Sequence, residues 1–163
     1  MSEPVEIRRA EERDLDAVLA IEAAWPTTPK WSREHFIREL SGAHAYFCVL
    51  TEGWVVVGYA VLWLLPPEAQ VTTLAIRTDR ARRGHAGRLM RHLHCKASKA
   101  GCSLVTLEVS ASNFAAIRLY EKLGYKAVGR RPEYYKDRTP ALLMNLELKA
   151  GCTTPSEGAP ENS

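Results

Sequence analysis

The sequence predicts a mixed α/β or α+β fold with one sheet of about six or seven strands, flanked by about four helices. Three observations support this prediction. Apolar residues recur with a period of two in some segments and of about 3.6 in others. Antiparallel-type strands occupy the middle of the chain, and a strand–helix–strand unit follows them. The chain has 163 residues, of which 46% are hydrophobic, so we expect one domain with one core.

The N-terminal part predicts a strand and two helices. Residues 5–9 alternate apolar and polar side chains, as in a short strand. Apolar residues at helical spacing follow at 15–21, after an acidic stretch that suits a helix N-terminus. Ser32 is the candidate N-cap of a second helix that ends at Gly42. This second helix is expected to bury three side chains, Phe36, Ile37 and Leu40.

The middle of the chain predicts three strands. Residues 45–51 and 54–65 are rich in valine and aromatic residues, and Glu52 and Gly53 separate them. This spacing is typical of a β-hairpin. Two prolines end the second run, and residues 69–77 form the next expected strand.

A helix and a buried strand come next. From Gly84 the apolar period changes to about 3.6, which predicts an amphipathic helix closed by Gly101. Residues 104–109 are almost all apolar, as expected of a strand buried on both faces. A strand, a helix and a strand in this order form a right-handed crossover. We therefore expect strands 69–77 and 104–109 to pair in parallel at the centre of a mostly antiparallel sheet.

The last predicted elements are a short helix and two strands. Asn113 is the candidate N-cap of the helix, and the strands cover residues 125–129 and 141–148. The domain is expected to span residues 1–149. Residues 150–163 carry no bulky apolar side chain and are expected to form a flexible tail.

Composition excludes several classes of protein. The longest apolar run, residues 54–65, is shorter than the roughly 20 residues that a membrane-spanning helix needs. The N-terminus lacks a basic region followed by an apolar stretch, so we expect no secretory signal and a cytoplasmic protein. The four cysteines are scattered without a C-x-x-C pair, which indicates reduced thiols and no zinc or redox motif. No metal site is expected.

Basic residues concentrate in one segment. The net charge is only +3, but seven Lys or Arg and no acidic residue lie between Arg80 and Leu107. This segment contains a junction of arginines and glycines that opens the predicted helix at Gly84. Glycines allow close backbone approach, and the N–H groups of a first helical turn bind anions, so the junction is a candidate pyrophosphate site. The alternative is a strand-to-helix loop on a solvated basic face.

The junction resembles the acyl-CoA-binding motif of the GNAT superfamily of N-acyltransferases, Q/R-x-x-G-x-G/A, which falls on residues 81–86. Its first position is Ala81, so Arg80 or Arg82 is the candidate for that side-chain contact. A more specific segment, residues 107–125, is similar to L-E-V-x-x-S-N-x-x-A-x-x-L-Y-x-x-L-G-F/Y of the ribosomal-protein alanine N-acetyltransferases, the RimI type. The resemblance extends over residues 5–149.

The resemblance implies direct attack of an amine on the acetyl-CoA thioester in a ternary complex. It assigns Glu108 as the general base, directly or through a water, and Tyr120 as the acid at the leaving sulfur. The residues alone leave other interpretations open. Without the resemblance, the residues favour Glu108 as a sheet glutamate paired with a basic neighbour, and Tyr120 as a core aromatic side chain of a helix stripe.

The same resemblance implies two groups of binding residues. Residues expected to bind acetyl-CoA are Leu74, Ala75, Ile76, Arg82, Arg83, Gly84, His85, Ala86, Gly87, Arg88, Asn113, Ala116 and Tyr120. Residues expected to bind the acceptor are Trp31, Glu108, Tyr134 and Tyr135.

Three hypotheses on function remain at this point. The first is acetylation of a protein N-terminal α-amine, alanine by resemblance, with a ribosomal protein among the candidate acceptors. The α-amine has a pKa near 8, against about 10.4 for lysine, and needs only weak base assistance. The second hypothesis is acetylation of a small-molecule amine or a lysine, and the third is a non-catalytic nucleic-acid-binding module. Under the first we expect no direct contact with nucleic acid or membrane, and a monomer or weak homodimer.

Overall fold

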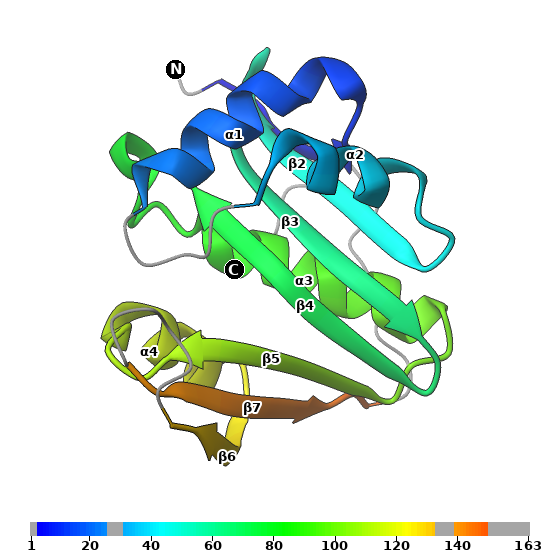
Figure 1. The fold of residues 1–163 in the computed structure, drawn as a ribbon, viewed down its shortest axis with the longest axis vertical. Helices are drawn as coiled ribbons and strands as arrows, with labels where there is room; N and C mark the ends of the chain where they lie inside the picture. The colour runs from blue at the N-terminus through cyan, green and yellow to red at the C-terminus, as the bar shows by residue number, and fades with distance from the viewer. Residues whose placement is uncertain (1–2, 26–30, 133–138, 150–163) are drawn as a thin grey trace.

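The computed structural model describes residues 3–25, 31–132 and 139–149 of the chain. These residues form a seven-stranded sheet in the order β1-β2-β3-β4-β5-β7-β6, with four α-helices (Figure 1). The strands are β1 Val5–Arg9, β2 Ala45–Glu52, β3 Val55–Leu65, β4 Glu68–Ile76, β5 Leu104–Ser110, β6 Lys126–Arg131 and β7 Ala141–Glu147. The helices are α1 Leu15–Ala24, α2 Arg33–Ser41, α3 His85–Lys99 and α4 Phe114–Lys122, with 3₁₀ turns at Glu12–Asp14 and Thr78–Arg80.

The predicted mixed sheet with a central parallel pair is confirmed. Neighbouring strands of the described sheet run antiparallel except β4 and β5, which are parallel. The connection between these two strands is α3, the crossover helix that the sequence predicts.

The helices cover the sheet on two faces (Figure 1). On one face, α3 buries four apolar side chains against the sheet, and α4 adds partly buried ones. On the other face, α1 and α2 pack over β2, β3 and β4. The α3 side chains of the first core are Leu89, Met90, Leu93 and Ala97. The helix residues of the second core are Leu15, Val18, Ile21 and Phe36.

A β-bulge interrupts the pairing of β3 with β4. Val61 of β3 pairs with Thr73, whereas Leu62 pairs with Val71, so Thr72 is an extra residue on β4. Such a bulge bends the strand that carries it. The parallel pairing of β4 with β5 ends at Val71 and Leu107, and the strands then diverge (Figure 1). The C-terminal half of β4 is therefore not paired with β5.

Local capping predictions are confirmed. The Ser32 hydroxyl accepts a hydrogen bond from the His35 N–H (3.1 Å), and the Asn113 side chain accepts one from the Ala116 N–H (3.3 Å). Gly101 and Gly124, which follow α3 and α4, have φ values of 90° and 101°, where glycine avoids the steric cost of a Cβ.

Three predictions about burial need correction. Ile37 is 40% exposed, because α2 turns Glu39 inward instead, where Trp63 Nε1 donates to its carboxylate (3.0 Å). Trp54 lies in the hairpin turn and is fully exposed, so β3 begins at Val55. Strand β5 is not buried on both faces. Its residues largely alternate between buried and half-buried, because the core under α1 and α2 is formed with β2, β3 and β4 and, among the described residues, includes no β5 side chain.

The structure also bears on membrane spans and on the C-terminal residues. No helix in the described part of the chain is long and apolar enough to cross a membrane. The predicted tail, residues 150–163, lies outside the described residues.

Candidate active site

The N-terminus of α3 is open to solvent and electropositive. Gly84 is the N-cap with a φ of 81°, and a Cβ placed there would meet nothing within 4 Å. The first turn carries no acidic residue, and Arg82, Arg83 and Arg88 are exposed around it. The first N–H groups of a helix have no intrahelical partner, so they are available to an anion. These residues fit the diphosphate of a nucleotide cofactor.

Glu52, at the end of β2, contacts residues on both sides of this helix N-terminus. Its carboxylate accepts a hydrogen bond from Arg80 Nε (3.0 Å) and lies 2.7 Å from His85 Nε2. The hydrogen bond with His85 and the neighbouring Arg80 together lower the pKa of Glu52. The imidazole of His85 is buried and turned toward Glu52, so position 85 offers a ligand its backbone N–H.

The Glu52 contact also distinguishes Arg80 from Arg82, the two candidates for the side-chain contact that Ala81 cannot make. Arg80 forms ion pairs with Glu52 (3.0 Å) and with Asp79 (3.1 Å). Arg82 is exposed and has a φ of 65°. Arg82 is therefore the better placed of the two. No local pattern in the sequence identifies Glu52, which lies 33 residues before His85.

The C-terminal half of β4 supplies backbone donors toward the divergence. The Arg77 N–H donates to Val57 O of β3 (2.7 Å). Alternate residues of a strand present their polar groups to opposite sides, so the Leu74 and Ile76 N–H groups point toward the β5 side. Trp25 Nε1 donates to Ile76 O (2.8 Å) and fixes the end of the strand. Ala75 is buried in the core under α1 and α2.

Glu108 points to the face of the sheet covered by α1 and α2. Its neighbours Leu107 and Val109 are buried in the α3 core, and successive strand residues point to opposite faces. The side chain is 22% exposed, and its Oε1 lies 3.1 Å from Arg131 of β6. The ion pair with a basic neighbour, one of the two interpretations open from the residues alone, is therefore present and orients the carboxylate.

Tyr120 lies on the opposite face, on α4. It packs half-buried against the core under α3, and its ring centroid is 5.7 Å from that of Tyr125. Ala116 is also half-buried on this helix, one turn before Tyr120. At Gly87 an added Cβ would lie 3.6 Å from Leu119 Cδ1, an ordinary van der Waals distance, so α4 packs next to the first turn of α3. Tyr120 and Glu108 thus flank the β4–β5 divergence from the two faces of the sheet.

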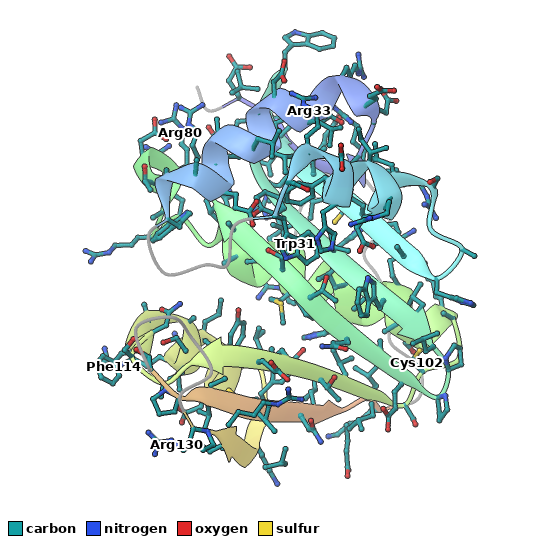
Figure 2. All side chains as sticks on the ribbon, viewed as in Figure 1. Trp31, Arg33, Arg80, Cys102, Phe114 and Arg130 are labelled. Atoms are coloured by element: carbon teal, nitrogen blue, oxygen red, sulfur yellow. The ribbon has the colours of Figure 1, made fainter. Side chains whose placement is uncertain are left out.

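Trp31 lies on the same face as Glu108, before α2 (Figure 2). Its ring stacks on His35 at 3.9 Å with an interplanar angle of 5° and packs against Phe36. The other two residues predicted to bind the acceptor, Tyr134 and Tyr135, lie outside the described residues.

Two other histidines of α3, His92 and His94, pair with tyrosines. His92 Nε2 lies 2.7 Å from the Tyr46 hydroxyl, and His94 Nε2 lies 2.8 Å from the Tyr125 hydroxyl. In the described ranges, no three His, Cys, Asp or Glu side chains are grouped as metal ligands.

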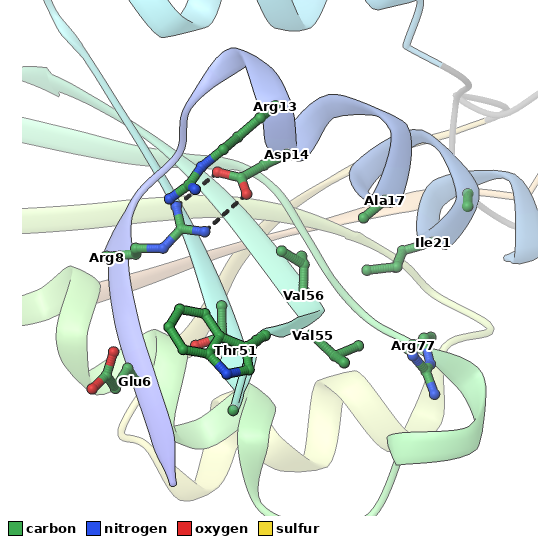
Figure 3. Close-up of a pocket in the computed structure, with 13 residues that line it drawn as sticks. Glu6, Arg8, Arg13, Asp14, Ala17, Ile21, Thr51, Val55, Val56 and Arg77 are labelled. Atoms are coloured by element: carbon green, nitrogen blue, oxygen red, sulfur yellow. Dashed lines mark hydrogen bonds and ion pairs between the residues drawn. The ribbon is translucent and has the colours of Figure 1, made fainter. Parts of the chain in front are cut away.

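A cavity of about 590 Å³ lies elsewhere, between α1, β1 and the β2–β3 turn (Figure 3). Arg8 and Asp14 form a bidentate pair across it, with N–O distances of 2.7 and 2.9 Å. Its lining residues include none of the residues predicted for the site. The cavity is therefore distinct from the β4–β5 divergence.

The arrangement at the divergence defines a class of enzyme. Glu108 lies one residue beyond the last β4–β5 pair, α3 begins after β4, and Tyr120 lies on the helix that follows β5. Acyl transfer from a nucleotide thioester to an amine requires groups of these kinds close together. Residues 6–125 match the model of the acetyltransferase (GNAT) family, and the chain belongs to this family. It is an acetyltransferase that uses acetyl-CoA.

Individual relatives agree with this assignment. The chain is 32% identical over 145 residues to the [ribosomal protein bS18]-alanine N-acetyltransferase of Escherichia coli K12, which covers 87% of this chain and 97% of the relative. It is 33% identical over 140 residues to N-alpha-acetyltransferase RimI of Mycobacterium tuberculosis, with coverages of 83% and 87%. The crystal structure of the ribosomal-protein-S18-alanine N-acetyltransferase from Escherichia coli superposes with a TM-score of 0.81, covering 98% of this chain and 99% of that one, at 31% identity.

Proposed function

We propose that this acetyltransferase modifies the N-terminal α-amine of a protein, with alanine as the first residue and a ribosomal protein as the acceptor. The observation that carries the proposal is the placement of Glu108 and Trp31 on one face of the sheet and of Tyr120 on the other. An acceptor reaching Glu108 thus enters from the α1–α2 face, opposite the face that carries Tyr120. The names of the two relatives, an S18-alanine and an N-alpha enzyme, support the choice of acceptor.

Glu108 acts on the acceptor. Its carboxylate accepts a proton from the ammonium group, directly or through one water, and the free amine attacks the acetyl carbonyl carbon. Arg131, 3.1 Å from Glu108 and 56% exposed, holds the carboxylate in place. An α-amine titrates near pH 8, so a single carboxylate suffices, whereas a lysine near 10.4 would need more help.

Backbone and phenol groups act on the donor. Acetyl-CoA supplies the thioester, and the α3 N-terminus with Arg82, Arg83 and Arg88 holds its diphosphate. The Leu74 or Ile76 N–H donates to the carbonyl oxygen as negative charge develops there. As the N–C bond forms and the C–S bond breaks, the Tyr120 hydroxyl gives its proton to the leaving sulfur. The second proton, which the attacking nitrogen loses as it becomes an amide, passes to solvent, and solvent reprotonates Tyr120.

We place this reaction in one domain, residues 1–149, in the cytoplasm, where ribosomal proteins are made. Cys48, Cys95 and Cys102 are free and buried in the structure. This agrees with a reducing compartment.

The test is thiol release from acetyl-CoA with a panel of acceptors. We expect peptides that begin with alanine to be acetylated at the α-amine faster than lysine side chains in blocked peptides, polyamines or other small amines. Mass spectrometry of the product locates the acetyl group. Preference for a polyamine or a lysine would refute the proposed acceptor while leaving the family assignment intact.

Glu108→Gln tests the base. The variant should lose roughly 10- to 100-fold in kcat/KM near pH 6.5, and the deficit should shrink toward pH 9, because the free amine then forms without help. Glu121→Gln, on the exposed side of α4, is the matched control and should behave as the wild type. A deficit that is the same at every pH would argue against general-base catalysis by Glu108.

A further inference from the structure

Tyr125 connects the helix that carries Tyr120 to α3. Its side chain is only 3% exposed, and its hydroxyl lies 2.8 Å from Nε2 of His94 on α3. Burial lowers the pKa of His94 to about 4 and raises that of Tyr125, so near pH 7 the phenol donates and the neutral imidazole accepts. The pair is a buried hydrogen bond between two elements of the site.

Tyr120 contacts Tyr125 directly. No residue of α4 is buried, so half-buried side chains hold this helix against the core. The Tyr125 N–H donates to Tyr120 O (2.9 Å), and the two rings lie 5.7 Å apart at 58°. A shift of the Tyr125 ring therefore reaches Tyr120 through both the backbone and the side chain.

We propose that the His94–Tyr125 pair is a positioning pair for catalysis, which holds the Tyr120 hydroxyl at the leaving sulfur. This proposal rests on the proposed role of Tyr120 as the donor to that sulfur. The pair itself touches no substrate. It acts because a hydrogen bond to a leaving atom depends steeply on distance and direction, and small displacements of a catalytic group slow the reaction strongly.

The first test is Tyr125→Phe, which removes one oxygen and keeps the ring. With the best acceptor of the amine panel, we expect kcat to fall roughly tenfold while KM for acetyl-CoA changes less than about twofold. His94→Leu should act alike, and His94→Gln, which keeps an acceptor for the phenol, should recover most of the loss.

The chain offers a matched control on the same helix. Tyr46 is buried and its hydroxyl lies 2.7 Å from His92 Nε2 of α3. Tyr46→Phe breaks an equivalent bond remote from α4 and should leave kcat unchanged. An equal loss of kcat in Tyr46→Phe and Tyr125→Phe would mean a general effect on the fold and would overturn the proposal.

A double variant decides whether the pair acts through Tyr120. In a Tyr120→Phe background, Tyr125→Phe should cost no further kcat, because the group it positions is already absent. If Tyr125→Phe lowers kcat tenfold both in the wild type and in the Tyr120→Phe background, the proposal is wrong. If Tyr120→Phe keeps the wild-type kcat, the donor role and this proposal are both wrong, while the acceptor preference measured on the panel stands or falls separately.

Discussion

At the scale of single residues, His94 links the site to the stability of the fold. Its side chain is 8% exposed, and burial, with a contribution from Arg91, lowers its pKa to about 4. An unfolded histidine titrates near pH 6.5, so between about pH 6.5 and 4 the unfolded chain binds a proton that the folded protein does not. Stability is therefore complete above about pH 6.5 and falls as the pH is lowered through this window.

We predict that the free energy of unfolding drops by roughly 3 kcal/mol between pH 6.5 and 4 because of His94. His94→Gln should flatten this part of the curve, measured by urea unfolding at a series of pH values. His44→Gln, at an exposed position, serves as the control and should keep the wild-type slope. A slope that survives in His94→Gln would assign the acid sensitivity to other groups.

The carboxylates act in a lower range of pH. Burial alone would raise the pKa of Asp14, but hydrogen bonds from Arg8 and from the Glu11 N–H outweigh it and the pKa is lowered. The pKa of Glu52 is lowered as well. Groups of this kind lose their contribution to stability as the pH falls below about 4, so their effect is separable from that of His94.

Residue roles were predictable from the sequence where local motifs carry them. Gly84, Asn113 and Ser32 each sit where a cap or a turn needs that residue type. The partner of Glu108 was not predictable. Arg131 is 23 positions later, and only the pairing of β5 and β6 with β7 brings the two side chains together.

At the scale of elements, α3 depends on a contact from the far end of the β2–β3 hairpin. Glu52 bonds Arg80 in the 3₁₀ turn before α3 and His85 at its first position. These bonds hold both ends of the proposed phosphate-binding loop, residues 80–85. Sequence periodicity predicts the strand, the turn and the helix, but it carries no information on this contact across the sheet.

We predict that Glu52→Gln raises KM for acetyl-CoA roughly three- to tenfold and changes kcat little, because the loop loses about 1 kcal/mol of charge-assisted hydrogen bonding. Steady-state kinetics at saturating acceptor measure the effect. Glu68→Gln, an exposed glutamate at the start of β4, is the control. An unchanged KM in Glu52→Gln would show that the loop keeps its shape without the anchor.

The bulge at Thr72 is the second feature that only the structure shows. Residues 69–77 look like a regular strand in sequence, and the extra residue leaves no mark in composition. The Thr72 hydroxyl donates a hydrogen bond to Val61 O (3.2 Å), so the carbonyl group opposite the bulge has a partner. The bulge directs the end of β4 away from β5, so the opening for the thioester depends on one residue that no motif identifies.

At the scale of the whole molecule, the sheet has two parts joined by a short parallel pair. Strands β1 to β4, with α3 at their end, meet β5, β7 and β6 through four residue pairs, Glu68 to Val71 with Leu104 to Leu107. The proposed cofactor contacts lie on both parts, at the α3 N-terminus and on α4. A bound cofactor therefore bridges the two parts beyond the point where backbone pairing ends.

Coenzyme A should stabilise the protein by mass action, because it binds only the folded state. At 100 times its Kd the gain is about 2.7 kcal/mol, which for a domain of this size raises Tm by roughly 5–10 °C. Arg82→Ala and Arg83→Ala combined should shrink the shift at the same concentration, because two cations beside the diphosphate are lost. Differential scanning fluorimetry measures both. Salt-dependent binding of an RNA oligonucleotide that coenzyme A does not diminish, together with no shift from coenzyme A, would instead assign the basic segment to nucleic acid.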